Sequence, residues 1–199
     1  MTSKDNKPEV IILCEDIDHE RFIRQYLICC GFEDRKIKNF PNVKGRKVNN
    51  NNDFVIKHYA PLVKSYRSKN FQNRAIVVMI DTDTNSINDI LRSLHIALDE
   101  QEGKLNRDPR LPNEKIAIFV PARNIETWFY YISIERNCDE RTDYKNSPAI
   151  RKWNRIDLRI DLAKSSAKKL SREICPQGLD SNALSSLHHA CDELRRLLN

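Results

Sequence analysis

Short apolar runs alternate along the chain with longer segments in which apolar residues recur at helical spacing. The runs over 9–14, 75–80 and 115–120 are rich in Val and Ile, and 35–40 alternates charged with apolar residues. Such runs, each followed by a polar segment and then a helical pattern, are typical of buried parallel strands. Helices are predicted over 18–30, 54–67, 157–174 and 182–198, and also after Asn85 or Ser86 and from about Ile125. The pattern predicts an α/β fold with a central, mainly parallel four-stranded sheet flanked by helices.

The 199 residues suit a single domain with a sizeable core. We expect residues 1–135 to form the α/β domain, and 136–199 to add a basic loop and C-terminal helices that pack on it. Gly31 is placed to end the helix over 18–30. Pro61 is expected to bend or divide the helix over 54–67.

The net charge of the chain is +6, and the positive charge is concentrated in one segment. Residues 141–172 contain ten Lys or Arg and three Asp, a charge of +7 that leaves −1 for the rest of the chain. A basic segment of this kind either binds phosphate groups or forms a solvated helical face. Two further basic residues, Lys44 and Arg46, lie in a polar loop that contains four consecutive asparagines.

Simple features of the sequence disfavour several classes of protein. No apolar stretch approaches the ~18 residues that span a bilayer, and residues 1–9 lack the apolar segment of a secretory signal. We therefore expect a cytoplasmic protein without membrane contact. The segment from Lys44 lacks the Gly-x-x-x-x-Gly-Lys spacing of a phosphate-binding loop, which argues against ATP hydrolysis. The six cysteines form no Cys-x-x-Cys pair and are expected to be free, buried thiols.

Acidic residues follow two of the predicted strands at the point where each strand ends. Glu15 and Asp16 come after the first run, and Asp81 and Asp83 come after the third. If the chain stays extended, Asp81 and Asp83 point to the same face, and Glu15 emerges beside them if the two strands are neighbours about 4.8 Å apart. Three such carboxylates repel one another unless a divalent cation or shared protons compensate. Because these ligands are all oxygen atoms, Mg²⁺ or Mn²⁺ is the predicted occupant.

A glutamate after the first strand and an Asp-x-Asp after the third resemble the Toprim domain, the catalytic module of topoisomerases, bacterial primases and nucleases of the overcoming-lysogenization-defect type. The resemblance covers about residues 9–131, with Glu15, Asp81 and Asp83 at the matching positions. It implies that the sheet is a Toprim-like variant of the Rossmann arrangement. The strings Cys14-Glu-Asp-Ile-Asp-His-Glu-Arg-Phe and Pro121-Ala-Arg-Asn-Ile-Glu-Thr-Trp are similar to small stand-alone Toprim-like proteins of bacteria, for which a role in phage defence has been suggested.

Other acidic residues near these strand ends have two interpretations each. Toprim proteins commonly have Gly directly after the first glutamate, so Asp16 is either a further metal ligand or the mark of a divergent site. Glu126 lies in the first turn of a predicted helix, where it either stabilises the helix through its dipole or binds a second metal ion. Asp18 and Glu20 are expected to be a helix cap and an exposed first-turn charge rather than metal ligands.

The Toprim resemblance implies a metal-dependent nuclease that hydrolyses phosphodiester bonds of DNA or RNA. A topoisomerase or a primase needs further modules, for which we expect 199 residues to leave no room. Glu15, Asp81, Asp83 and, as a second-metal ligand, Glu126 are expected to hold the ions, and Lys145 or Lys152 to stabilise the phosphate charge. The nucleic-acid backbone is expected along basic residues, of which we single out Arg151, Lys152, Arg155, Lys44 and Arg46.

Two rival interpretations stay open. The chain is alternatively a non-catalytic or conditionally active subunit that acts with a separately encoded ATPase as its partner protein. A receiver domain of two-component signalling also has an acidic pair after its first strand and a phospho-accepting aspartate after its third, which would be Asp81. However, the 66 residues from Glu15 to Asp81 are many for that fold, and Pro121-Ala122-Arg123 stand where such domains have a lysine.

The aromatic residues and histidines indicate less. Trp128 lies in an apolar helix and is expected in the core, whereas Trp153, beside basic residues, either packs internally or stacks on bases. Tyr144 is expected to be exposed, either without a role or in contact with substrate. The five histidines, His19 among them, are scattered and indicate no catalytic arrangement.

Overall fold

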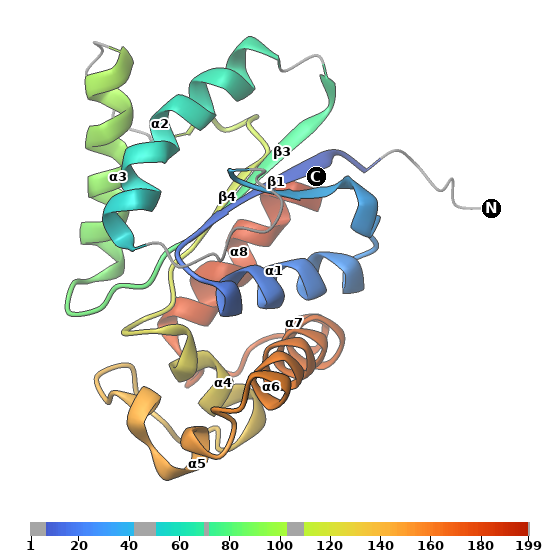
Figure 1. Ribbon diagram of the computed structural model, residues 1–199, viewed down its shortest axis with the longest axis vertical. Helices are drawn as coiled ribbons and strands as arrows, with labels where there is room; N and C mark the ends of the chain where they lie inside the picture. The colour runs from blue at the N-terminus through green and yellow to red at the C-terminus, as the bar shows by residue number, and fades with distance from the viewer. Residues whose placement is uncertain (1–6, 42–50, 70–71, 103–109, 199) are drawn as a thin grey trace.

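The computed structural model describes residues 7–41, 51–69, 72–102 and 110–198, and these form an α/β fold (Figure 1). The central sheet contains four strands, namely β1 (Glu9–Cys14), β2 (Ile37–Asn39), β3 (Arg74–Met79) and β4 (Ile116–Phe119). Their order across the sheet is β2-β1-β3-β4, and each pairing is parallel. The predicted four-stranded parallel sheet is therefore confirmed.

Helices fill the connections between the strands and form the C-terminal part. The longer ones are α1 (Ile17–Cys29), α2 (Asn52–Ser68), α3 (Ile87–Glu102), α4 (Ile125–Ser133), α6 (Ile156–Lys169) and α8 (Ser185–Leu198). Shorter pieces are α5 (Pro148–Arg151), α7 (Cys175–Gln177), a π-helical turn at Leu170–Ile174 and 3-10 turns at Asp34–Lys36 and Tyr144–Asn146. Among the described residues, no helix has the length and apolar character of a membrane span.

Two local predictions about the helices have different outcomes. Gly31 follows α1 with a left-handed φ of 88°, and its N–H donates to the Ile28 carbonyl at 2.9 Å, so the predicted role of Gly31 in ending α1 is confirmed. By contrast, α2 is not divided at Pro61. Its buried residues on both sides of the proline, such as Tyr59 and Val63, pack into the core and stabilise the helix across it.

The two faces of the sheet are covered by different helices (Figure 1). Val77 and Met79 of β3 share a core with α1 and α8, whereas Ile76 and Val78 share a core with α2 and α3. Successive side chains of a strand point to opposite faces, so a strand that is buried on both faces must be apolar throughout. This is why β3 has the continuous apolar run that identified it.

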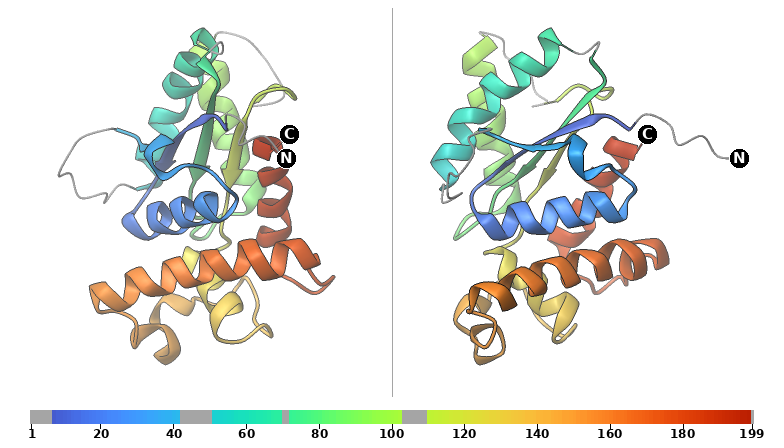
Figure 2. Two further views of the ribbon diagram at one scale, coloured as in Figure 1. Left: turned by 90° about the vertical axis from the view of Figure 1, so that its right-hand side faces the viewer. Right: turned by 45° about the vertical axis from the view of Figure 1, so that its right-hand side comes forward.

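The C-terminal helix α6 lies outside the layer that contacts the sheet (Figure 2). It packs mainly against α1 and α4, and its buried residues Leu162, Ala163 and Ala167 join the same core as α1.

Candidate metal and phosphate site

The carboxyl ends of β1 and β3 lie side by side, because the two strands are neighbours in the sheet. Their register pairs Cys14 with Met79, so Glu15 and Asp81 follow close to one another. The Glu15 carboxylate accepts a hydrogen bond from the Asp81 backbone N–H at 2.9 Å. Glu15 therefore emerges beside Asp81, as neighbouring strands require.

Asp83 reaches the same edge of the sheet by a route that we did not expect. β3 ends at Met79, and Asp83 has a left-handed φ of 52°, so the extended geometry does not persist from Asp81 to Asp83. The Asp83 N–H donates to the Arg123 carbonyl at 2.9 Å, and its carboxylate accepts from the Asn52 side-chain amide at 2.9 Å. The loop after β4 and the start of α2 thus position Asp83.

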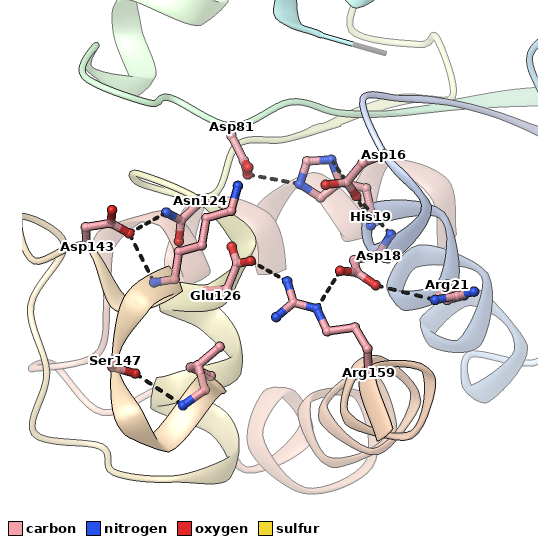
Figure 3. A network of polar contacts seen from close by, with 12 residues as sticks. Asp16, Asp18, His19, Arg21, Asp81, Asn124, Glu126, Asp143, Ser147 and Arg159 are labelled. Atoms are coloured by element: carbon pink, nitrogen blue, oxygen red, sulfur yellow. Dashed lines mark hydrogen bonds and ion pairs between the residues drawn. The ribbon is translucent and has the colours of Figure 1, made fainter. Parts of the chain in front are cut away.

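A buried imidazole lies among these carboxylates. His19 of α1 is fully buried, with Nε2 2.9 Å from Asp81 Oδ1 and Nδ1 3.8 Å from Asp16 Oδ1 (Figure 3). Burial alone would lower the pKa of a histidine, but the charges of Asp81, Asp16 and Glu15 outweigh it and raise the pKa of His19 to about 10. The surrounding carboxylates therefore favour the cationic form of His19.

Burial also perturbs the carboxyl groups around this cation. It raises the pKa of Glu15 to about 8 and the pKa of Asp81 to about 6, although the charge of His19 lowers both. For Asp16, burial is outweighed by His19 and by two backbone N–H donors, so its pKa is lowered. Perturbed carboxyl groups gathered at strand ends are typical of functional sites.

The residue that caps the N-terminus of α1 is not the one that we predicted. Asp16 is the N-cap of α1, and its Oδ1 accepts hydrogen bonds from the Asp18 and His19 N–H groups, both at 2.9 Å. Asp18, the predicted cap, is instead buried and paired with Arg159. Glu20 is half-buried rather than exposed, and it lies 3.6 Å from Arg24.

A second ion network joins α1, α4 and α6. Arg159 of α6 donates to the Asp18 carboxylate at 2.6 Å and also to the Glu126 carboxylate (Figure 3). Glu126 is buried in the first turn of α4. Its carboxylate is thus engaged by a guanidinium, an arrangement that neither interpretation of Glu126 anticipated.

A cavity of about 430 Å³ lies at the strand ends, and we name it the acidic cavity. It is lined by four of the acidic residues singled out in the sequence, together with a lysine: Glu15, Asp16, Asp81, Asp83 and Lys145. Asp143 adds a further carboxylate to the lining. Glu126 does not line it, because its side chain is turned to Arg159.

Two asparagine side chains that line the acidic cavity have an amide oxygen without a hydrogen-bond partner among the described residues. Asn52 donates to Asp83 through Nδ2, and Asn124 donates to Asp143 through Nδ2 at 3.0 Å (Figure 3). The Oδ1 atom of each asparagine is buried and accepts no hydrogen bond from the part of the chain that the structure describes. Buried polar atoms are rarely unpartnered in proteins, so a bound water, ion or ligand is expected at such positions.

The donor set of the acidic cavity fits a hard divalent cation. Carboxylate and amide oxygens are the ligands that Mg²⁺ and Mn²⁺ prefer. Within the described ranges, no three acidic, His or Cys side chains already converge at metal-binding spacing. The Asp81 carboxylate contacts His19 instead, and Glu15 contacts the Asp81 backbone. A cation would therefore bind with some rotation of these side chains.

Basic groups also line the acidic cavity. Lys145 lines it as an exposed side chain, and Arg123, which we did not single out as a site residue, lines it from the loop after β4. The other basic residues singled out in the sequence do not line it. Arg151, Lys152 and Arg155 are exposed on α5 and before α6, and Lys44 and Arg46 lie outside the described residues.

Tyr144 is less exposed than predicted, whereas Trp128 lies where it was predicted. Tyr144 is buried, and its hydroxyl accepts a hydrogen bond from the Asp139 N–H at 3.1 Å, so the predicted exposure is wrong. Trp128 is in the core, as predicted, and donates to Ser186 Oγ at 2.8 Å. Trp153 is half-buried against the core that contains α1 and α4.

Comparisons with protein-family models, curated proteins and solved structures found no match. The chemistry of the cavity is therefore inferred from its own residues. The sequence indicated His19 only weakly. It lies about one helical turn after Asp16, and the first turn of a helix that follows a strand lies near the end of that strand. No sequence pattern indicated Arg159, because 141 positions separate it from Asp18.

Proposed function

We propose that this protein is a metal-dependent phosphodiesterase that hydrolyses nucleic acid with chemistry of the Toprim type. The observation that carries the proposal is the acidic cavity itself. Glu15, Asp81 and Asp83 line it at the carboxyl ends of parallel strands, beside the unpartnered amide oxygens of Asn52 and Asn124. Ligand sites of open α/β sheets gather at this edge.

The residues that line the acidic cavity, and His19 behind it, would have different roles. Glu15, Asp81 and Asp83 would hold Mg²⁺ or Mn²⁺, and a bound divalent cation supplies Lewis-acid activation of water and of the phosphate. Arg123 and Lys145 would orient the phosphodiester and neutralise its charge. His19 positions the Asp81 carboxylate through its 2.9 Å contact, in the way that an outer partner orients a ligand.

The same geometry argues against the receiver interpretation. A phospho-accepting aspartate must be accessible to attack a phosphoryl donor. Asp81 is 7% exposed and its carboxylate contacts the His19 imidazolium. His19 engages Asp81 Oδ1 and leaves Oδ2, and a phosphoryl donor would have to reach that oxygen on a residue that is almost fully buried.

The proposal is tested by cleavage of single- and double-stranded DNA and RNA with Mg²⁺ or Mn²⁺. Asp83→Asn is the preferred variant, because Asp83 is exposed and its replacement should leave the fold intact. We expect metal-dependent cleavage by the wild type and a loss of about 100-fold or more in Asp83→Asn. Asp161→Asn, an exposed aspartate of α6 outside the cavity, is the matched control and should cut normally.

Absence of cleavage by the folded wild type on all four substrates would contradict an independent nuclease. Calorimetric titration with Mg²⁺ then distinguishes a conditionally active subunit from a protein without a metal site. Metal binding that depends on Asp83, without cleavage, would favour a conditionally active subunit that acts with a partner such as an ATPase. Loss of both metal binding and cleavage would reject the metal site.

A further inference from the structure

A second cavity, of about 660 Å³, adjoins the acidic cavity, and we name it the side cavity. Asp83, Thr84 and Arg123 line both cavities and form the wall between them. The volume of the side cavity lies in the range of about 300–1,000 Å³ that small-molecule ligands occupy. A ligand that contacts Arg123 in one cavity can therefore continue into the other.

Two of the three residues that form the wall between the cavities have left-handed backbones. Asp83 has a φ of 52° and Arg123 a φ of 64°. The Arg123 N–H donates to Thr82 Oγ1 at 2.6 Å, and the Asp83 N–H donates to the Arg123 carbonyl at 2.9 Å. Such conformations are uncommon in residues other than glycine, and they cluster at turns and functional sites.

Two guanidinium groups line the side cavity, together with the carboxylates of Asp83 and Glu140. Arg123 and Arg141 both line it, and within the described residues neither guanidinium is in ion-pair distance of a carboxylate. Glu140 also lines the cavity, but its carboxylate caps α8 by accepting from the Ser186 N–H at 2.8 Å and from the Ser185 hydroxyl. The two guanidinium groups are thus available to an anion or to the face of a base.

The rest of the side cavity offers hydrogen bonds around a small apolar surface. Asn85 and Asn88 line it at the start of α3 beside Ser86, whose hydroxyl is engaged by Asp89, and Ile87 and Ala122 add apolar contact. This combination suits a nucleobase, whose edge carries donors and acceptors and whose face is apolar.

One residue that lines the side cavity has a buried ring nitrogen without a hydrogen-bond partner in the described chain. His189 lines the cavity, and its Nδ1 is buried without a hydrogen bond from the described chain. The side cavity therefore combines cations, neutral hydrogen-bonding groups and an unpartnered nitrogen.

We propose that the side cavity holds one unpaired nucleotide next to the phosphodiester bound in the acidic cavity, and that the substrate is single-stranded nucleic acid. This inference rests on the proposed function. A base that is paired in a duplex cannot enter a cavity of this kind without leaving the stack, whereas a base in a single strand enters freely. Arg123 would contact the nucleic-acid strand where the strand passes from the acidic cavity to the side cavity.

Binding is measured by fluorescence anisotropy with a short labelled single-stranded oligonucleotide and with the corresponding duplex, in EDTA to prevent metal-dependent hydrolysis. We expect the single strand to bind more tightly than the duplex. Arg141→Ala should weaken single-strand binding about tenfold, and Asn88→Ala about fivefold. Both residues are exposed, so the variants should fold.

Arg172→Ala is the matched control, because Arg172 is exposed in the same basic segment but lines neither cavity. It should change the affinity less than about twofold, the effect of one distant phosphate contact at moderate salt. Equal losses in Arg141→Ala and Arg172→Ala would overturn the inference, because they would indicate unspecific attraction of the backbone. Equal affinity for single strand and duplex would overturn it as well.

The cleavage assay separates this inference from the proposed function. Single-strand binding that depends on Arg141, in a protein that cuts nothing, would reject the nuclease and leave the nucleotide site supported. Cleavage of duplex and single strand at equal rates, with an unchanged kcat/KM in Arg141→Ala, would establish the nuclease and reject the nucleotide site.

Discussion

At the scale of single residues, the acidic cavity depends on compensation between buried charges. Crowded carboxylates require a counter-charge, and a divalent cation and shared protons are two ways to supply it. The structure adds a third, because the His19 imidazolium lies 2.9 Å from Asp81 and also close to Asp16. The acidic residues can therefore stay close together before any metal ion binds.

Removal of this imidazolium should destabilise the fold. We expect His19→Ala to lower the free energy of unfolding by about 3 kcal/mol at neutral pH in EDTA, because Asp81 then stays buried without its partner. Urea denaturation measures the change. His95→Ala is the control, since His95 pairs with Asp99 on the same helix face at 2.9 Å and should cost about 0.5 kcal/mol. Equal losses in the two variants would contradict the importance of the buried charge.

At the scale of elements, β4 shows how an edge of the sheet is protected. β4 is the last strand in the sheet order, so one side of it has no strand partner in the described sheet. Glu193 of α8 accepts a hydrogen bond from the Ile118 N–H at 2.7 Å and pairs with Arg110. The helix α8 thus occupies an edge that would otherwise be able to pair with another chain.

This contact makes a prediction about β4. Glu193→Ala should cost about 3 kcal/mol in unfolding free energy, because it removes the acceptor of a buried N–H and the counter-charge of a buried guanidinium. Hydrogen exchange of the Ile118 amide should accelerate more than that of Val77 in the centre of the sheet. Glu173→Ala, at an exposed glutamate, should change neither amide. Unchanged exchange at Ile118 in Glu193→Ala would show that α8 does not protect this edge.

At the scale of the whole molecule, a buried ion network connects the C-terminal helices to the α/β part. Arg159 of α6 contacts Asp18 of α1 and Glu126 of α4. These contacts lie beneath the acidic edge of the sheet, next to His19 (Figure 3). The orientation of α6 is therefore coupled by ion pairs to α1 and α4, the two helices that begin at this edge.

Replacement of Arg159 tests this coupling. Arg159→Ala should cost about 3 kcal/mol, because two carboxylates stay buried without their cation. Arg155→Ala removes an exposed pair with Asp157 and should cost less than about 0.5 kcal/mol. The triple variant Arg159→Leu, Asp18→Asn, Glu126→Gln should recover most of the loss in urea denaturation. A triple variant as unstable as Arg159→Ala would show that the packing of the arginine stem matters, and not the charge balance.

The sequence by itself determined the strands and helices and the acidic ends of two strands. Strands buried on both faces must be apolar throughout, so periodicity alone located β1, β3 and β4 to within a residue or two. Because β1 and β3 are parallel, residues that follow them in the chain also meet in space, which is why Glu15 and Asp81 were identified.

Only the tertiary structure decided what surrounds those carboxylates. The turn at Asp83, the imidazolium of His19 and the amides of Asn52 and Asn124 depend on how loops and helices from distant parts of the chain pack together. The contact between Arg159 and Asp18 spans 141 positions. Hydrophobic periodicity reflects only the neighbours of a residue along its own strand or helix. Contacts between distant residues depend on how whole elements pack against one another, so no local sequence pattern predicts them.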